Sequence, residues 1–116
     1  MKFYYNGKLV RTSKTHVYKY AIVKKADAES DATKIKPFAC SKDMAGIDSN
    51  LAYLSKDLRM WEAVKNGTYV KKNSHYFSRD QLIAQAKEWY GSVDAAIQKQ
   101  REFFAQWIVV KLEARE

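Results

Sequence analysis

Residues 3–23 read FYYNGKLVRTSKTHVYKYAIV and decide how the rest of the chain is interpreted. The Asn6-Gly7 pair predicts a tight β-hairpin, because a two-residue type I′ turn needs positive φ at both central positions, which Asn and Gly adopt most easily. Aromatic and β-branched residues flank the pair on both sides, as is typical of strands. The stretch therefore predicts a hairpin followed by a third strand.

The turn fixes a register for the predicted hairpin. Four pairs of residues then face each other: Tyr5 and Lys8, Tyr4 and Leu9, Phe3 and Val10, and Lys2 and Arg11. A second turn at Ser13-Lys14 would place Arg11 opposite His16. One face of the sheet would then hold Tyr4, Leu9, Arg11, His16, Tyr18, Tyr20 and Ile22. Neither face is cleanly polar, so the sequence leaves open which face is buried.

The remainder of the first forty residues predicts a loop and a short strand. Residues 24–33 are small and charged, which indicates an exposed loop. Residues 35–41 predict a fourth strand, and Pro37 favours an edge position because proline cannot donate a hydrogen bond to a neighbouring strand.

The hydrophobic period changes after residue 43. Apolar residues recur every three or four positions along one stripe: Met44, Ile47, Leu51, Leu54, Leu58 and Trp61. The stripe predicts a helix that is capped by Ser41 or Asp43, ends at Asn66-Gly67 and packs on the sheet. Gly46 costs about 1 kcal/mol relative to Ala inside a helix, so a start at residue 48 or 49 is the alternative.

Two further helices and one ambiguous segment complete the chain. Ser78 and Gln81 match a capping box that starts a helix ending at Gly91, and Ser92 caps the next helix. Residues 107–112, WIVVKL, fit either a buried strand or a continued helix. We favour helix, because no Gly or Pro interrupts the helical pattern before them.

The order of these elements predicts the fold class and the domain organisation. Strands first and helices afterwards are typical of an α+β fold. We expect one domain over residues 1–116, with a basic, strand-rich part at 1–42 and a mainly helical part at 43–116. An antiparallel meander of three or four strands would carry two or three helices packed on one face.

Charge and composition restrict the surroundings and the partners of the protein. The net charge is +8, and residues 1–42 hold ten Lys and Arg but only three Asp and Glu. Such an excess favours a polyanionic partner, although basic surfaces also keep small domains soluble. The sequence has no signal peptide, no membrane-spanning apolar run and one cysteine, Cys40, so we expect a cytoplasmic protein without membrane contact.

The sequence lacks the motifs of metal, nucleotide and covalent chemistry. His16, His75 and Cys40 lie at no metal-ligand spacing, so we expect no metal and no other cofactor. The four glycines are isolated, which disfavours a phosphate-binding loop. No nucleophile elbow is present. We therefore favour a protein that is not an enzyme.

The most specific functional prediction concerns the strands. Flat rings alternate with cations there, and single-stranded nucleic acids bind such surfaces because bases stack on rings while Lys and Arg neutralise phosphates. We expect a non-enzymatic RNA- or DNA-binding module of bacterial or phage origin. The candidate binding residues are Arg11, Lys14, His16, Tyr18, Lys19 and Tyr20.

Two alternatives belong to other functional classes. The first is a protein–protein interaction or regulatory module of bacterial, phage or mobile-element origin, whose interface would be the aromatic sheet face or the apolar stripe of residues 44–61. The second is a metal-independent ribonuclease, in which Arg11 would hold the phosphate while His16 and Tyr18 act as base and acid.

Overall fold

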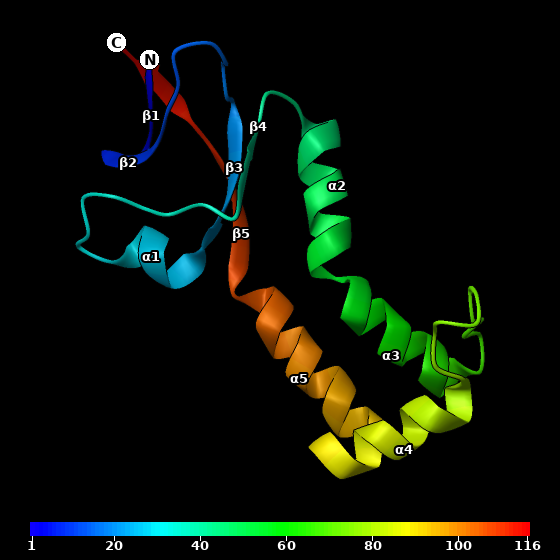
Figure 1. The fold of residues 1–116 in the computed structure, drawn as a ribbon. Helices are drawn as coiled ribbons and strands as arrows, with labels where there is room; N and C mark the ends of the chain where they lie inside the picture. The colour runs from blue at the N-terminus through cyan, green and yellow to red at the C-terminus, as the bar shows by residue number, and fades with distance from the viewer. The chain divides into compact units, whose positions relative to one another are not determined.

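The computed structural model describes all 116 residues and confirms the α+β fold (Figure 1). The chain forms two compact units. Residues 1–53 and 105–116 make the first, here called the strand unit, and residues 54–104 make the second, the helical unit. The last twelve residues thus return to the strand unit. None of the helices is long and apolar enough to cross a membrane.

The first sheet contains the predicted hairpin. Strands β1 (Lys2–Tyr5) and β2 (Lys8–Thr12) pair antiparallel, and β6 (Glu113–Arg115) pairs with the other edge of β1. Between β1 and β2, Asn6 and Gly7 have φ values of 48° and 78°. Both positive values confirm the turn predicted from these two residues.

The register of the hairpin is as predicted beside the turn and shifted beyond it. Tyr4 pairs with Leu9, but an irregularity between Phe3 and Tyr4 adds one residue to β2, so that Phe3 faces Arg11. The predicted pairing of Phe3 with Val10 is therefore wrong. Directly paired residues share a face of the sheet, so the bulge moves Arg11 away from the face of Tyr4 and onto the face of Phe3.

A second sheet replaces the predicted four-stranded meander. It has the order β4-β3-β5, where β3 is Tyr20–Lys24, β4 is Ala39–Ser41 and β5 is Trp107–Lys111. The predicted pairing of the third strand with β2 is wrong, since residues 13–19 form no strand and lead instead from one sheet to the other. The Ser13 hydroxyl accepts the His16 backbone N–H at 3.0 Å, which makes a wider turn than the predicted two-residue loop.

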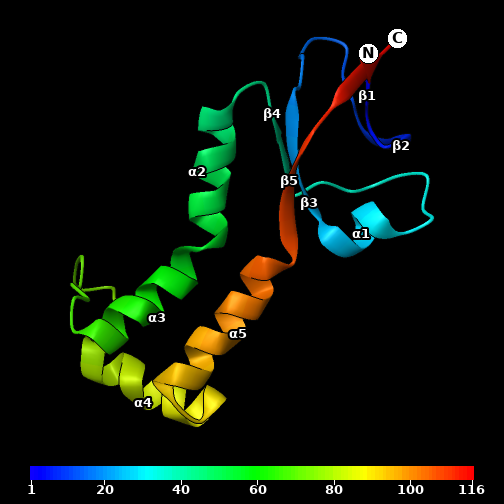
Figure 2. The ribbon, with the colours of Figure 1, turned by 180° about the vertical axis from the view of Figure 1, so that it is seen from behind.

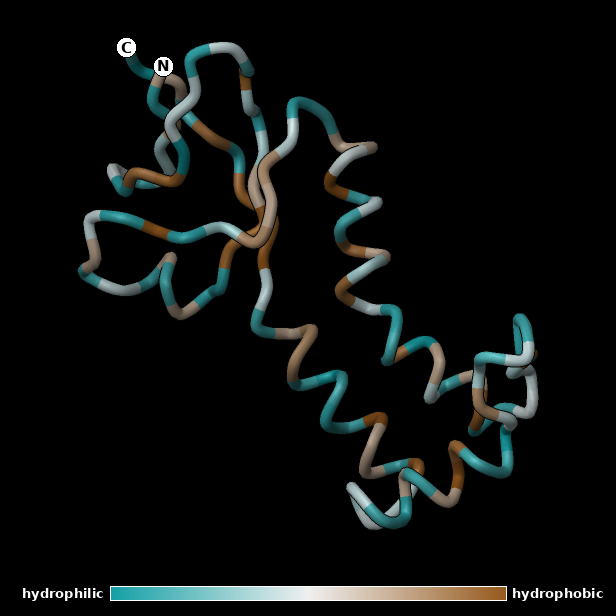
Figure 3. The backbone as a smooth tube through the Cα atoms, in the orientation of Figure 1, coloured by the Kyte–Doolittle hydropathy of each residue, from teal (hydrophilic) through white to brown (hydrophobic).

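The strand β5 corrects the prediction of helix for residues 107–112. It pairs along its whole length with β3, from Trp107 opposite Lys24 to Lys111 opposite Tyr20. Figure 3 shows the apolar stretches of both strands in this region. The burial of Val110 against β3 outweighs the local helical pattern, as tertiary packing commonly does for β-branched residues.

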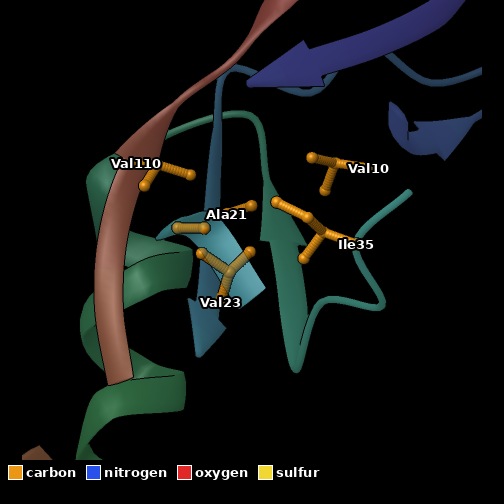
Figure 4. Packing of buried hydrophobic residues seen from close by; sticks show 6 residues of the cluster. Val10, Ala21, Val23, Ile35 and Val110 are labelled. Carbon is orange, nitrogen blue, oxygen red and sulfur yellow. The ribbon is translucent and has the colours of Figure 1, made fainter. Parts of the chain in front are cut away.

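The core of the strand unit lies on one face of this second sheet. Ala21 and Val23 from β3 meet Val10 from β2 and Ile35 (Figure 4). The predicted exposed loop at 24–33 is wrong in part, because α1 (Lys25–Glu29) forms there and buries Ala28 in the same cluster. Residues 21, 22 and 23 are each fully buried, so both faces of β3 are covered.

The helix predicted for residues 44–66 is divided in two. Helix α2 (Met44–Leu54) and helix α3 (Lys56–Asn66) are separated by Ser55. The Asp43 carboxylate accepts the Gly46 N–H at 2.9 Å, which confirms Asp43 as the N-cap and overturns the later start. A Cβ on residue 46 would overlap the Ser41 hydroxyl, and this explains a glycine in the first turn.

The helical unit has its own core. Helices α3, α4 (Arg79–Tyr90) and α5 (Val93–Ala105) follow one another (Figure 2) and together enclose one cluster. Its buried members are Trp61, Val64, Leu82, Ala86, Ala96 and Ile97. Trp61 at the end of the predicted stripe thus packs against α4 and α5 instead of a sheet. Ile47, Leu54 and Trp61 of the stripe are buried, whereas Met44 is exposed.

Candidate nucleic-acid interface

The connector of residues 13–19 carries four of the predicted binding residues, namely Lys14, His16, Tyr18 and Lys19. It is held at both ends by backbone hydrogen bonds, from the Ser13 N–H to the Met1 carbonyl at 3.0 Å and from the Lys19 N–H to the Ser41 carbonyl at 2.9 Å. The Ser13 hydroxyl also accepts the N–H groups of Thr15 and His16. These bonds fix the position from which His16 projects.

The connector forms one wall of a hollow of about 610 Å³ in the strand unit. Residues 15–19 line one side, and residues 40–43, from β4 and the turn before α2, line the other. Two exposed cations, Lys19 and Lys42, line the hollow, one from each of these two segments. The Asp43 carboxylate also lines the hollow but is engaged in capping α2.

The ring of Tyr18 is the centre of an aromatic and cationic cluster at this hollow. His16 stacks on it with centroids 6.0 Å apart and planes at 14°. The guanidinium carbon of Arg11 lies 5.3 Å from the centroid of the same ring, within the range of a cation–π contact. Arg11 and His16 thus each contact the ring of Tyr18, but the predicted strand pairing of Arg11 with His16 is wrong, since Arg11 pairs with Phe3.

The two rings differ in exposure. Tyr18 is half-buried, because its ring also contacts the fully buried Phe3, whereas His16 is exposed. The Thr15 hydroxyl lies 2.9 Å from the His16 Nδ1, which restrains the imidazole. His16 is therefore the outermost flat ring of the site, and Tyr18 is the support beneath it.

Two of the predicted residues stand apart from this cluster. Tyr20 is the first residue of β3 and pairs with Ser41 and Lys111. Side chains alternate along a strand, so Tyr20 lies on the face opposite Ala21, away from the core of the strand unit. Lys14 is exposed on the connector but does not line the hollow.

The opposite wall supplies residues that the sequence did not single out. No local sequence pattern indicates that Cys40 and Lys42 lie here, because β3, the strand that pairs with their segment, is not adjacent to it in the sequence. Burial raises the pKa of the Cys40 thiol above its ordinary value of 9.0, and the charge and hydrogen bond of Arg11 lower it in part. At neutral pH the thiol is therefore protonated, which makes it a poor nucleophile.

Positive charge is spread over both units. The strand unit holds twelve Lys and Arg against seven Asp and Glu, and the helical unit holds nine against six. The excess of positive charge is thus larger on the strand unit but is not confined to it. It is smaller there than over residues 1–42 alone, because the strand unit also contains the acids Asp43, Asp48, Glu113 and Glu116.

Comparison with known proteins identifies no relative: no protein-family model matches the chain, and no curated protein or solved structure matches it significantly. The chemistry of the hollow is therefore the basis for any functional argument. It combines an exposed ring, cations on both walls and a restrained backbone.

Proposed function

We propose that the protein binds single-stranded nucleic acid, RNA or DNA, in the hollow between residues 15–19 and residues 40–43. The observation that carries this proposal is the exposed His16 ring, stacked on Tyr18 and flanked in the same hollow by Lys19 and Lys42. A base stacks on the outer face of His16, and the two lysines neutralise the adjoining phosphates. Arg11 adds positive charge beside the Tyr18 ring.

Single strands suit this arrangement better than a duplex does. Bases within a duplex stack on one another, whereas those of a single strand are free to stack on a protein ring, at about 1–3 kcal/mol per base. Lysine contacts to phosphates release counterions, so the affinity should fall as salt is added. An apolar protein interface would respond little to salt.

The test is an anisotropy titration of the full-length protein with labelled single-stranded RNA, single-stranded DNA and duplex DNA at low and at physiological salt. Two matched pairs of variants locate the site. Lys19→Glu is compared with Lys34→Glu, which makes the same change of charge at an exposed position outside the hollow. His16→Ala is compared with His75→Ala, since both histidines are exposed and only His16 lines the hollow.

We expect salt-sensitive binding that prefers single strands. Lys19→Glu removes one charge contact and His16→Ala removes one stacking ring, so each should weaken the affinity about tenfold. Their controls should weaken the affinity about twofold or less. Equal effects of the paired variants would place the site elsewhere. No binding at low salt would refute the function.

A second candidate, metal-independent cleavage of RNA, is favoured by the grouping of Arg11, His16 and Tyr18. In this reaction the RNA 2′-hydroxyl attacks the adjacent phosphorus and the bond to the 5′-oxygen breaks. His16 takes the hydroxyl proton, Tyr18 gives a proton to the leaving oxygen, and a 2′,3′-cyclic phosphate forms. Electrophoresis of the RNA after titration tests it: cleavage should persist with a chelator and vanish in His16→Ala but not in His75→Ala.

A further inference from the structure

A groove of about 470 Å³ lies wholly within the helical unit, between α3 and residues 68–76. Lys56, Arg59, Met60 and Ala63 form one wall. In chain order they are three, one and three positions apart along α3, which places them on one face of the helix. The other wall includes Tyr69, Val70, Lys72 and Tyr76.

The second wall is anchored to α3. Gly67 ends the helix in the left-handed conformation, with φ of 75°, and so reverses the chain. The N–H groups of Thr68 and Tyr69 then both donate to the Ala63 carbonyl, at 3.0 and 3.1 Å. The Tyr69 hydroxyl donates to the Phe77 carbonyl at 2.7 Å, which ties down the far end of the segment. The groove is therefore formed before any ligand arrives, which lowers the entropic cost of binding.

The chemistry of the groove is divided between apolar and cationic groups. Val70 and Tyr76 line it with 78% and 48% of their surface exposed, so both offer apolar surface to a ligand. Lys72 from the segment and Lys56 and Arg59 from α3 bring positive charge from both walls, against the single carboxylate of Asp57.

These properties select an amphipathic, anionic ligand. A purely apolar ligand would make no favourable contact with the cationic groups, and a simple anion would leave Val70 and Tyr76 in water. A nucleotide meets both requirements, because its base is flat and its phosphate is charged. Tyr76 is the ring of the groove on which the base would stack, and Lys72 is a cation that would pair with the phosphate.

We infer that this groove is a second nucleotide-binding site, separate from the hollow of the strand unit. The inference rests on the proposed function, because that function suggests a nucleotide as the ligand. The residues of the groove, however, belong entirely to the helical unit. It assigns a role to Lys72 and Tyr76, which do not line the hollow of the strand unit.

The test is an amide NMR titration of the ¹⁵N-labelled full-length protein with 5′-AMP, with adenosine and inorganic phosphate as partial ligands. We expect AMP to shift amides of residues 56–63 and 68–76, with at least a fivefold lower affinity for either partial ligand. Lys72→Glu should weaken AMP binding about tenfold, whereas Lys71→Glu, the same change at a neighbour outside the groove, should weaken it little. Tyr76→Ala should also weaken it more than Phe77→Ala does.

The two proposals fail in different ways. AMP shifts confined to residues 15–19 and 40–43 would overturn this inference and leave the proposed function standing. AMP shifts confined to the groove, together with no binding of single strands by the hollow, would support this inference and overturn the proposed function. Equal affinity for adenosine and AMP, or equal effects of Lys72→Glu and Lys71→Glu, would overturn the nucleotide assignment.

Discussion

The Tyr18 ring stands edge-on to the ring of Phe3, with centroids 5.5 Å apart and planes at 79°. Phe3 is fully buried in the strand unit, so this contact joins an otherwise exposed connector to the core. Edge-to-face aromatic pairs contribute about 0.5–1.5 kcal/mol beyond the burial of their surface. Tyr18 therefore stabilises the fold as well as supporting His16.

We predict that Tyr18→Ala lowers the free energy of unfolding by about 2 kcal/mol, since it removes a half-buried ring and its contact with Phe3. Tyr18→Phe keeps the ring and should lower it by less than about 1 kcal/mol. Urea unfolding followed by circular dichroism measures both. An unchanged midpoint for Tyr18→Ala would mean that the connector is not fixed to the core. Binding is accordingly better tested at His16 and Lys19.

The half-buried thiol of Cys40 predicts that the free energy of unfolding depends on pH in the alkaline range. Its pKa is raised in the folded protein by burial, so the unfolded chain loses this proton first as the pH rises. The contribution of this group to the free energy of unfolding is therefore complete below the unfolded pKa of 9.0, and it is lost as the pH rises from that value through the higher pKa of the folded state.

Comparison of the wild type with Cys40→Ala isolates this effect from the titration of other groups. We expect the free energy of unfolding to fall more steeply between pH 8 and pH 10, flanking the ordinary pKa of 9.0, in the wild type than in Cys40→Ala. Urea titrations at several pH values measure it. Parallel pH profiles for the two proteins would show that the thiol has the same pKa in both states.

In the first turn of α2, we expect a Gly-to-Ala substitution to lower the free energy of unfolding, although helix propensity alone predicts that it raises it. Gly46→Ala would normally stabilise a helix, by about 1 kcal/mol. Here the new Cβ would overlap the Ser41 hydroxyl and lie 3.0 Å from the Ser41 Cβ, so we expect a net loss of about 1 kcal/mol through overpacking. In a Ser41→Ala background the loss should shrink. A double-mutant cycle from thermal or urea unfolding measures the coupling, and additive effects would contradict it.

Features with local causes could be predicted from the sequence. The Asn6-Gly7 turn, the Asp43 cap and the start of α4 at Ser78 each depend on residues within a few positions of one another. The separation of the strands into two sheets could not be predicted, because it depends on pairing across the whole chain. The pairing of β5 with β3 joins Val110 to Ala21, and no short-range signal indicates it.

The same distinction applies to the candidate site. Arg11, His16 and Tyr18 could be proposed as a group because they are close in sequence, although the bulge in β2 and the connector bring them together by an unpredicted route. Lys42 could not be placed opposite Lys19, since their proximity depends on the pairing of β3 with β4. The groove of the helical unit depends on the folding back of residues 68–76 and had no sequence signal either.

The capping box of α4 gives the last prediction. The Ser78 hydroxyl accepts the Gln81 N–H at 3.2 Å, and the Gln81 side-chain oxygen accepts the Ser78 N–H at 2.8 Å. Ser78→Ala leaves one of the first helical N–H groups without this acceptor and should cost about 1 kcal/mol.

Ser74→Ala is the matched control, because Ser74 is an exposed serine four residues earlier that caps no helix. Its cost should be within about 0.5 kcal/mol of zero, as for most surface substitutions. Because α4 contributes Leu82 and Ala86 to the core of the helical unit, the loss for Ser78→Ala should appear as a lower midpoint of urea unfolding. Equal midpoints for the two variants would mean that α4 is held by its packing alone and that the cap adds nothing measurable.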